Sequence, residues 1–211
     1  MTNRKIVALK FLVFPACLLP LADLIYRGFT GQLGPDQIAT ITHTTGFWTL
    51  YFLLITLAVS PIRRLSNHLS WLIRFRRMLG LFAFFYGTLH LTTYIWLFSN
   101  FNVHAMVKDI VKRPFITVGM LGWVCLLALA LTSTTWSIRK LGGKRWQALH
   151  RLIYVAAIAG VVHYWWIVKP GVRTPWTVTV ILALLLLARI LWNARQSARK
   201  RNTAVIESAG S

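Results

Sequence analysis

The stretch that decides the fold reads WQALHRLIYVAAIAGVVHYWW over residues 146–166 and carries His150 and His163 thirteen residues apart. A helix rises about 1.5 Å per residue, so the two imidazoles lie roughly 20 Å apart along its axis. This distance covers most of a hydrocarbon core about 30 Å thick. Ionisable side chains inside a membrane are rare and mark functional sites, and histidines commonly hold haem iron. The pair therefore predicts redox centres near both sides of a bilayer.

The composition agrees with a membrane protein. Of 211 residues, 56% are hydrophobic and 13% are charged, whereas soluble domains carry about 25% charged residues. A chain of this length predicts one membrane domain. The net charge of +20 would suggest nucleic acid as the partner of a soluble protein. Here the basic residues fall between apolar runs, so we expect no nucleic-acid partner.

The two cysteines, Cys17 and Cys125, both lie inside apolar runs. They predict neither a disulfide nor a zinc site, and small buried apolar side chains account for them. The chain has no Cys-x-x-Cys-His motif, which excludes covalently attached haem.

Six apolar runs are long enough to cross a membrane as helices. They cover residues 8–26, 46–62, 78–98, 115–135, 149–168 and 174–193. The first contains Pro15 and Pro20 and no clear cleavage site follows it, so we interpret it as a retained helix rather than a signal peptide. The predicted fold class is an all-α integral membrane protein with six transmembrane helices.

The basic residues predict the orientation of these helices. Sixteen of the 24 Lys and Arg residues fall on the side that holds both termini, and six fall on the other. Positive charge favours the cytoplasmic side, so both termini are expected in the cytoplasm. We expect a single domain over residues 1–195 and a basic, polar cytoplasmic tail over residues 196–211. The tail is expected to be disordered.

His90 and His163 are predicted at similar depth in the outer half of the membrane. Each lies about thirteen or fourteen residues from the cytoplasmic start of its span. Two histidines on different helices at one level can supply both axial nitrogens of a haem, so the pair predicts a bis-histidine site. The alternative is that each buried imidazole only bonds a neighbouring hydroxyl or carbonyl group.

His150, at the inner end of the fifth span, has no evident partner. At 100° per residue it lies about 140° around the helix from His163, so the two face one side only if the helix is overwound or bent, with Gly160 a candidate position. The other three histidines are weaker candidates. His68 is expected in a solvated loop, His104 outside the bilayer beyond a loop at residues 99–102, and His43 at the outer end of the second span.

Arg74, Arg76 and Arg77 precede the third span. Guanidinium pairs well with carboxylate and phosphate, so haem propionates or a flavin phosphate are candidate partners, and ordinary positive-inside charge is the alternative. On the other side, Arg113 in the Lys-Arg-Pro sequence at 112–114 is a candidate contact for a partner or an outer propionate. No acidic residue lies at mid-membrane, which argues against a carboxylate-based proton pump or transporter. No internal repeat is visible.

At this point the chain resembles the MsrQ (YedZ) family, within the ferric-reductase-like transmembrane group. The resemblance covers about residues 8–195. The matching stretches are RRMLGL at 76–81, TLHLTTY at 88–94, RPFIT at 113–117, WQALHRLIY at 146–154 and HY at 163–164. His43 begins a family-like HTTG block at 43–46.

The resemblance implies a bacterial inner-membrane subunit that binds one or two haem b groups. The family's haem-associated histidines correspond to His90, His150 and His163. Family members pass electrons to MsrP, a periplasmic molybdopterin methionine sulfoxide reductase, with which a heterodimer is expected. The donor is expected to be the quinone pool or a flavin reductase, and FMN is a further expected cofactor. Methionine sulfoxide is a polar lesion that disrupts packing, and its reduction would occur on the partner.

We therefore expect an electron conduit in which His90 and His163 ligate an outer haem. His150 would contribute to an inner haem or to the site where electrons arrive. One rival is a transmembrane ferric or other metal reductase of the same haem architecture. A second, of another class, is a cofactor-free transporter or assembly scaffold whose histidines tolerate replacement.

Overall fold

The computed structural model describes residues 3–168 and 173–209, and most of these residues are helical. Lys169, one of the basic residues predicted on the outer side, lies outside the described residues. In chain order the elements are α1 (Asn3–Phe29), α2 (Gln37–Leu65), the 3-10 helix η1 (Asn67–Arg74), α3 (Arg76–Thr93), the π-helical turn η2 (Tyr94–Phe98), α4 (Val103–Lys112), α5 (Pro114–Leu131), α6 (Thr135–Leu141), α7 (Gly143–Leu149), α8 (Leu152–Ile167) and α9 (Thr174–Ala209).

The six predicted spans are confirmed as six helices of membrane-crossing length and hydropathy. They cover Asn3–Phe29, Gln37–Leu65, Arg76–Phe98, Pro114–Leu131, Gly143–Ile167 and Thr174–Arg199. Apolar side chains face outward along them, as in Phe11, which is 78% exposed, and Leu184, which is 60% exposed. Water would disfavour such a surface, whereas lipid acyl chains accept it. The chain is a multi-pass membrane protein.

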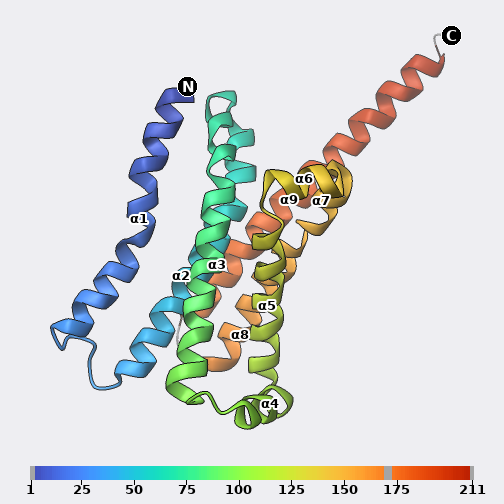
Figure 1. Ribbon diagram of the computed structural model, residues 1–211. Helices are drawn as coiled ribbons and strands as arrows, with labels where there is room; N and C mark the ends of the chain where they lie inside the picture. The colour runs from blue at the N-terminus through green and yellow to red at the C-terminus, as the bar shows by residue number, and fades with distance from the viewer. Residues whose placement is uncertain (1–2, 169–172, 210–211) are drawn as a thin grey trace.

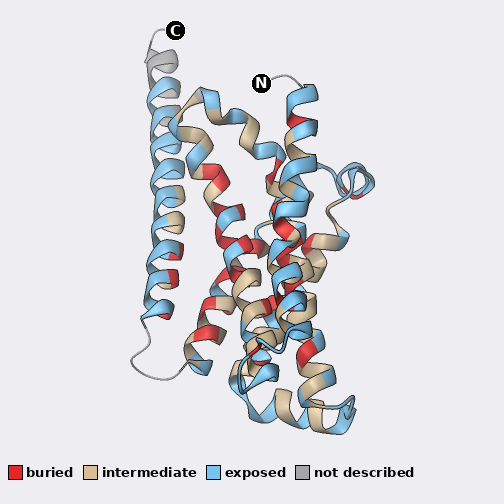
Figure 2. Ribbon diagram, turned by 90° about the vertical axis from the view of Figure 1, so that its left-hand side faces the viewer, coloured by how far each residue is buried: buried red, intermediate tan, exposed pale blue. Residues whose placement is uncertain are grey.

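The bundle is built around α2, α3, α5 and α8, with α1 and α9 at its periphery (Figure 1). Buried residues concentrate where the central helices meet (Figure 2). Between α2 and α3 the core is aromatic, and the rings of Phe52 and Tyr86 stack 5.4 Å apart. Between α5 and α8 it is made of small residues, with Gly122 against Ala156 and Ala159. Small side chains let membrane helices approach closely.

Two features of the helices differ from the sequence-based expectation. Helix α2 begins at Gln37 rather than near residue 46, because the Asp36 side chain accepts a hydrogen bond from the Ala39 N–H at 2.9 Å and caps the helix. The fifth span is interrupted at His150 and Arg151, between α7 and α8, and not near Gly160. Helix α9 extends to Ala209, and the expected disorder of the tail stays a prediction.

The two ends of the bundle differ in charge. The basic end holds the start of α1, the end of α2 and the start of α3, together with α6, α7 and the exposed arginines of α9. The opposite end holds the α1–α2 connection, η2 and α4 (Figure 1). The short helix α4 connects α3 to α5 there, after a turn in which Asn100 and Phe101 have positive φ.

One buried hydrogen bond attaches α1 to the bundle and provides a test of the packing. The Tyr86 hydroxyl, on a side chain only 1% exposed, donates to the Cys17 carbonyl at 2.9 Å. We expect Tyr86→Phe to lower the free energy of unfolding by about 0.5–1.5 kcal/mol, measured as a lower thermal midpoint in detergent. Tyr26→Phe, at a side chain 62% exposed, is the control. Equal midpoints for the two variants would contradict this role.

Candidate functional site

Two cavities lie one after the other along the bundle. The first, here called the paired-histidine cavity, has a volume of about 740 Å³ and lies between α2, α3, α5 and α8. The second, the arginine cavity, has a volume of about 1010 Å³ and lies toward the basic end. Volumes of about 300–1,000 Å³ are typical of small-molecule and cofactor sites. Leu53 and Leu126 line both cavities, so a thin layer of apolar side chains separates them.

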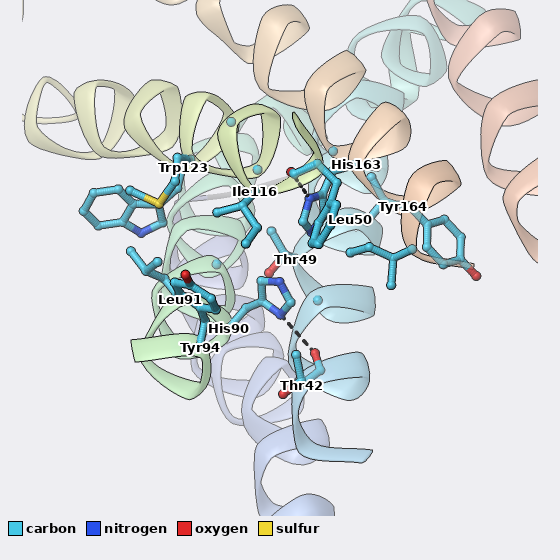
Figure 3. A pocket seen from close by; sticks show the side chains of 18 of the residues that line it. Thr42, Thr49, Leu50, His90, Leu91, Tyr94, Ile116, Trp123, His163 and Tyr164 are labelled. Carbon is cyan, nitrogen blue, oxygen red and sulfur yellow. Dashed lines mark hydrogen bonds between the residues drawn. The ribbon is translucent and has the colours of Figure 1, made fainter. Parts of the chain in front are cut away.

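His90 on α3 and His163 on α8 face each other in the first cavity (Figure 3). Their ring centres are 5.9 Å apart and their planes are inclined by 85°. The structure thus brings together the two imidazoles that the sequence predicted at one depth. A metal–imidazole bond is about 2 Å long, so two ring nitrogens that face one ion lie about 4 Å apart. The observed separation of the ring centres, 5.9 Å, is close to the separation that this arrangement requires.

Each imidazole is fixed by one backbone carbonyl group. The Nδ1 of His90 lies 3.0 Å from the Thr42 oxygen, and the Nδ1 of His163 lies 2.7 Å from the Phe115 oxygen (Figure 3). A carbonyl oxygen can only accept, so Nδ1–H donates in both rings. Each neutral ring then keeps a lone pair on Nε2. Within the described residues neither Nε2 has a hydrogen-bond partner, and this is the tautomer in which a histidine ligates metal through Nε2.

A glycine makes each of these carbonyl groups accessible. In an α-helix the carbonyl of residue i accepts from the N–H of residue i+4, and here the i+4 residues are Gly46 and Gly119. A Cβ at Gly46 would lie 3.1 Å from the His90 ring, and one at Gly119 would lie 2.8 Å from Nδ1 of His163. A larger residue at either position would collide with the imidazole. Glycine therefore lets the carbonyl keep its helical bond and also accept from the ring.

The two halves of the cavity repeat one arrangement. Each carbonyl lies 48 residues before the histidine that it orients, and a further glycine lies three residues before each histidine, at Gly87 and Gly160. The hairpin α2–α3 thus presents His90 as the hairpin α5–α8 presents His163. The repeat was not visible in the sequence, because only the backbone acceptor, the glycines and the histidine are shared at these spacings.

A small polar network lines the paired-histidine cavity at the end that faces α4. Asp109 and Arg113 form an ion pair at 3.1 Å, and the Tyr94 hydroxyl donates to Asp109 at 3.3 Å. All three residues line the cavity. Asp109 lies on α4 and Arg113 directly follows it, so the short helix closes this end of the cavity. Arg113 was a candidate contact from the sequence, whereas Tyr94 and Asp109 were not.

The arginine cavity contains His150 as its one imidazole among the described residues. His150 Nε2 lies 3.2 Å from the Thr132 hydroxyl oxygen, and the His150 ring stacks on Trp146 with centres 3.8 Å apart. The Trp146 indole N–H donates to the Thr132 carbonyl at 2.9 Å. This Thr132–Trp146 contact holds the break between α7 and α8 against the end of α5. No second histidine faces His150 in the part of the chain that the structure describes.

The three arginines predicted near the third span divide between two places. Arg76 and Arg77 line the arginine cavity. Arg74 does not, because it is exposed in η1, where its guanidinium donates to the Asn3 side chain. The same cavity is lined by arginines that sequence reasoning had not selected, namely Arg63, Arg64, Arg151 and Arg189. These belong to α2, α9 and the residue before α8, and no local motif connects them.

The remaining three histidines are exposed. His43 lies on α2 and lines the paired-histidine cavity. His68 is exposed in η1, and His104 is exposed on α4. The loop expected before His104 is present, and neither His68 nor His104 lines a cavity.

Six spanning helices with two imidazoles facing across an internal cavity define a polytopic membrane protein with a candidate bis-imidazole centre. Residues 45–161 match the family described as ferric reductase like transmembrane component. The heme-binding subunit MsrQ of protein-methionine-sulfoxide reductase from Herminiimonas arsenicoxydans is 52% identical over 200 residues, which is 94% of this chain and 91% of the relative. The chain belongs to the MsrQ family of ferric-reductase-like transmembrane proteins.

Other relatives carry the same name. The MsrQ subunit of Azospira oryzae is 48% identical to this chain, and the match covers 92% of this chain and 83% of the relative. That of Ralstonia nicotianae is 44% identical and covers 92% of each chain. The likeness extends over the whole bundle, including both cavities.

The close approach of His163 to Gly119 leads to a direct test. We expect Gly119→Ala to force the His163 ring away from the Phe115 carbonyl, since the new Cβ would lie 2.8 Å from Nδ1. Overpacking of this kind lowers the free energy of unfolding by about 1–3 kcal/mol, measured as thermal unfolding in detergent. Gly143→Ala is the matched control, because a Cβ there meets nothing within 4 Å. A midpoint for Gly119→Ala equal to that of the control would refute the close contact.

Proposed function

We propose that this protein is a membrane electron-transfer subunit that holds haem b between His90 and His163. The observation that carries the proposal is the pair of imidazoles fixed at Nδ1 by carbonyl groups, with both Nε2 atoms free to face one iron. Relatives named as heme-binding subunits support it. When bound, haem supplies an iron that accepts and releases one electron at a time.

The residues around the imidazoles suit this group. The cavity walls are mainly apolar and include Leu50, Leu91, Ile116 and Met120. Apolar burial excludes water and tunes the reduction potential of a haem. At the end closed by α4, Arg113 pairs with Asp109 through Nε, and the other N–H groups of its guanidinium suit a propionate carboxylate. The backbone bonds to Nδ1 raise the basicity of each ring and fix its orientation.

The arginine cavity is proposed as the site where electrons arrive. It offers one imidazole, His150, together with Arg76 and Arg77. Guanidinium groups suit the phosphate of a flavin such as FMN, and the space also admits a quinone head group. A second haem there would need an axial ligand other than histidine. Leu53 and Leu126 border both this cavity and the paired-histidine cavity, so the two cavities adjoin there.

The partner is proposed to be a periplasmic MsrP-type molybdopterin reductase that repairs oxidised methionine. The relatives are subunits of a protein-methionine-sulfoxide reductase by name. Basic residues gather at the arginine-cavity end, so the positive-inside rule assigns that end and both termini to the cytoplasm. In a bacterial inner membrane the paired-histidine cavity would then face the periplasm. Electrons from a quinone or a flavin reductase would leave there toward the partner.

A metal reductase is the second candidate, because the matched family is described as ferric reductase like. The two functions differ in what accepts the electrons. Reduction of ferric iron by the purified protein without a partner would favour the metal reductase. Transfer to a periplasmic methionine sulfoxide reductase, with no activity toward ferric iron, would favour the electron-transfer subunit.

The axial assignment predicts the visible spectrum of variants. His90→Ala and His163→Ala should each abolish the b-type signal in a reduced-minus-oxidised spectrum, because each removes one of the two nitrogen ligands. His104→Ala, at an exposed histidine on α4, should leave the signal intact. An unchanged spectrum in both cavity variants would exclude the assignment.

For His150 we expect no loss of the haem signal, in contrast to His90 and His163. We expect one haem per chain, and we expect His150→Ala to keep that haem while it slows reduction by the donor, because the imidazole lies in the electron-input cavity. Haem content is measured as a pyridine haemochromogen, and reduction is followed by stopped flow. A second haem per chain that disappears in His150→Ala would show instead that His150 is an axial ligand.

A further inference from the structure

A small cleft on the lipid-facing side of the basic end carries two arginines. It lies between the end of α2 and the middle of α9 and has a volume of about 120 Å³. This is the space of about four water molecules, enough for a phosphate group. Its lining combines Arg64 and Arg189 with Ser60 and Trp192. The cleft is separate from the arginine cavity, although the two arginines border both.

Aromatic rings and a hydroxyl group position these guanidinium groups. The Arg64 guanidinium lies 5.0 Å from the centre of the Trp192 ring, and that of Arg189 lies 5.0 Å from the Tyr154 ring. Arg189 also donates to the Ser60 hydroxyl at 3.4 Å. Stacking on an aromatic face leaves the edge of a guanidinium group, where its N–H donors point, free to bind an oxyanion.

Carboxylates do not neutralise this positive charge within the described residues. The ion pairs there are Asp23–Arg27 and Asp109–Arg113, both toward the opposite end. The nearby Arg63 has a buried Nε without a hydrogen-bond partner. Several guanidinium groups in one place repel one another in a medium of low dielectric constant. An anion from outside the chain would therefore stabilise this arginine cluster.

The depth of the cleft matches a lipid head group. Arg189 lies fifteen residues after Thr174, where α9 begins, or about 22 Å along the helix. A hydrocarbon core is about 30 Å thick, so the Arg189 side chain reaches the boundary of the leaflet at the basic end. Exposed leucines continue from the cleft along α9 toward the middle of the membrane. Leu187 is 51% exposed and Leu184 is 60% exposed.

We propose that this cleft binds the phosphate of an anionic phospholipid from the leaflet at the basic end. Arg64 and Arg189 bind the phosphate oxygens, Ser60 contributes its hydroxyl group, and the acyl chains lie along the exposed leucines. Basic pockets between transmembrane helices on the cytoplasmic side bind such lipids. The lipid would join α9 to α2, and the single negative charge of its phosphate would offset part of the positive charge of two arginines that also border the arginine cavity. This proposal does not depend on the presence of haem.

The test compares full-length protein in nanodiscs of phosphatidylcholine with and without phosphatidylglycerol. We expect the wild-type protein to retain phosphatidylglycerol in native mass spectrometry and to unfold at a higher temperature when that lipid is present. Arg64→Gln and Arg189→Gln should each lower the retention about fivefold, since one basic residue near a membrane surface contributes about that factor. Two variants on different helices keep the test available if one fails to fold.

Arg195→Gln is the matched control, because it removes the same charge from an exposed position on α9 outside the cleft. If Arg195→Gln retains phosphatidylglycerol about as well as the wild-type protein does, the result supports a defined lipid site. A loss equal to that of Arg64→Gln would show only general attraction to the basic end and would overturn the proposal. Millimolar inorganic phosphate, added to protein in phosphatidylcholine alone, provides the other arm. If it stabilises the protein as much as phosphatidylglycerol does, the ligand is a soluble phosphate and the lipid is excluded.

Discussion

The arrangement of the central helices depends on two hydrogen bonds from imidazole N–H groups to backbone carbonyl groups that already belong to helices. Each joins a pair of helices, α3 to α2 through His90 and Thr42, and α8 to α5 through His163 and Phe115. In a bilayer every backbone polar group must find its partner inside the protein. At both places the residue one turn after the accepting carbonyl is a glycine, Gly46 or Gly119, and the absence of a side chain leaves room for the imidazole against the helix.

This constraint also explains the symmetry of the site. Two hairpins that are unlike in most side chains present one histidine each, from the same distance along the chain and over the same glycine position. Their cores differ, since aromatic rings fill the space between α2 and α3, and glycine and alanine fill the space between α5 and α8. The property that the two hairpins share is therefore the backbone bond at Nδ1, which leaves each Nε2 without a hydrogen-bond partner among the described residues. The haem proposed above would be held through these two nitrogens.

The two cavities differ in charge although they adjoin. Around the paired histidines, polar groups are few and mutually satisfied, as in the Asp109–Arg113 pair. Around His150, arginines from α2, α3, α9 and the start of α8 converge without carboxylate partners in the described segments. An apolar compartment beside a cationic one, separated by Leu53 and Leu126, suits an anionic donor at one end and a buried one-electron carrier at the other. Anionic lipid in the lateral cleft would further moderate the positive charge.

The six spans, the class of fold and the matching depth of His90 and His163 follow from the order of the residues alone. Hydropathy and helical rise are local properties, and together they give the depth of each residue along a spanning helix. The direction in which each ring faces, and the groups that meet around it, depend on how the helices pack. Thr42 and Phe115 act through backbone oxygens, which no residue type reveals, and Arg64 and Arg189 converge only because α9 packs against α2. The direction of a side chain depends on the rotation of its helix about the helix axis and on breaks such as the one at His150. Packing between helices sets the rotation and the position of such breaks.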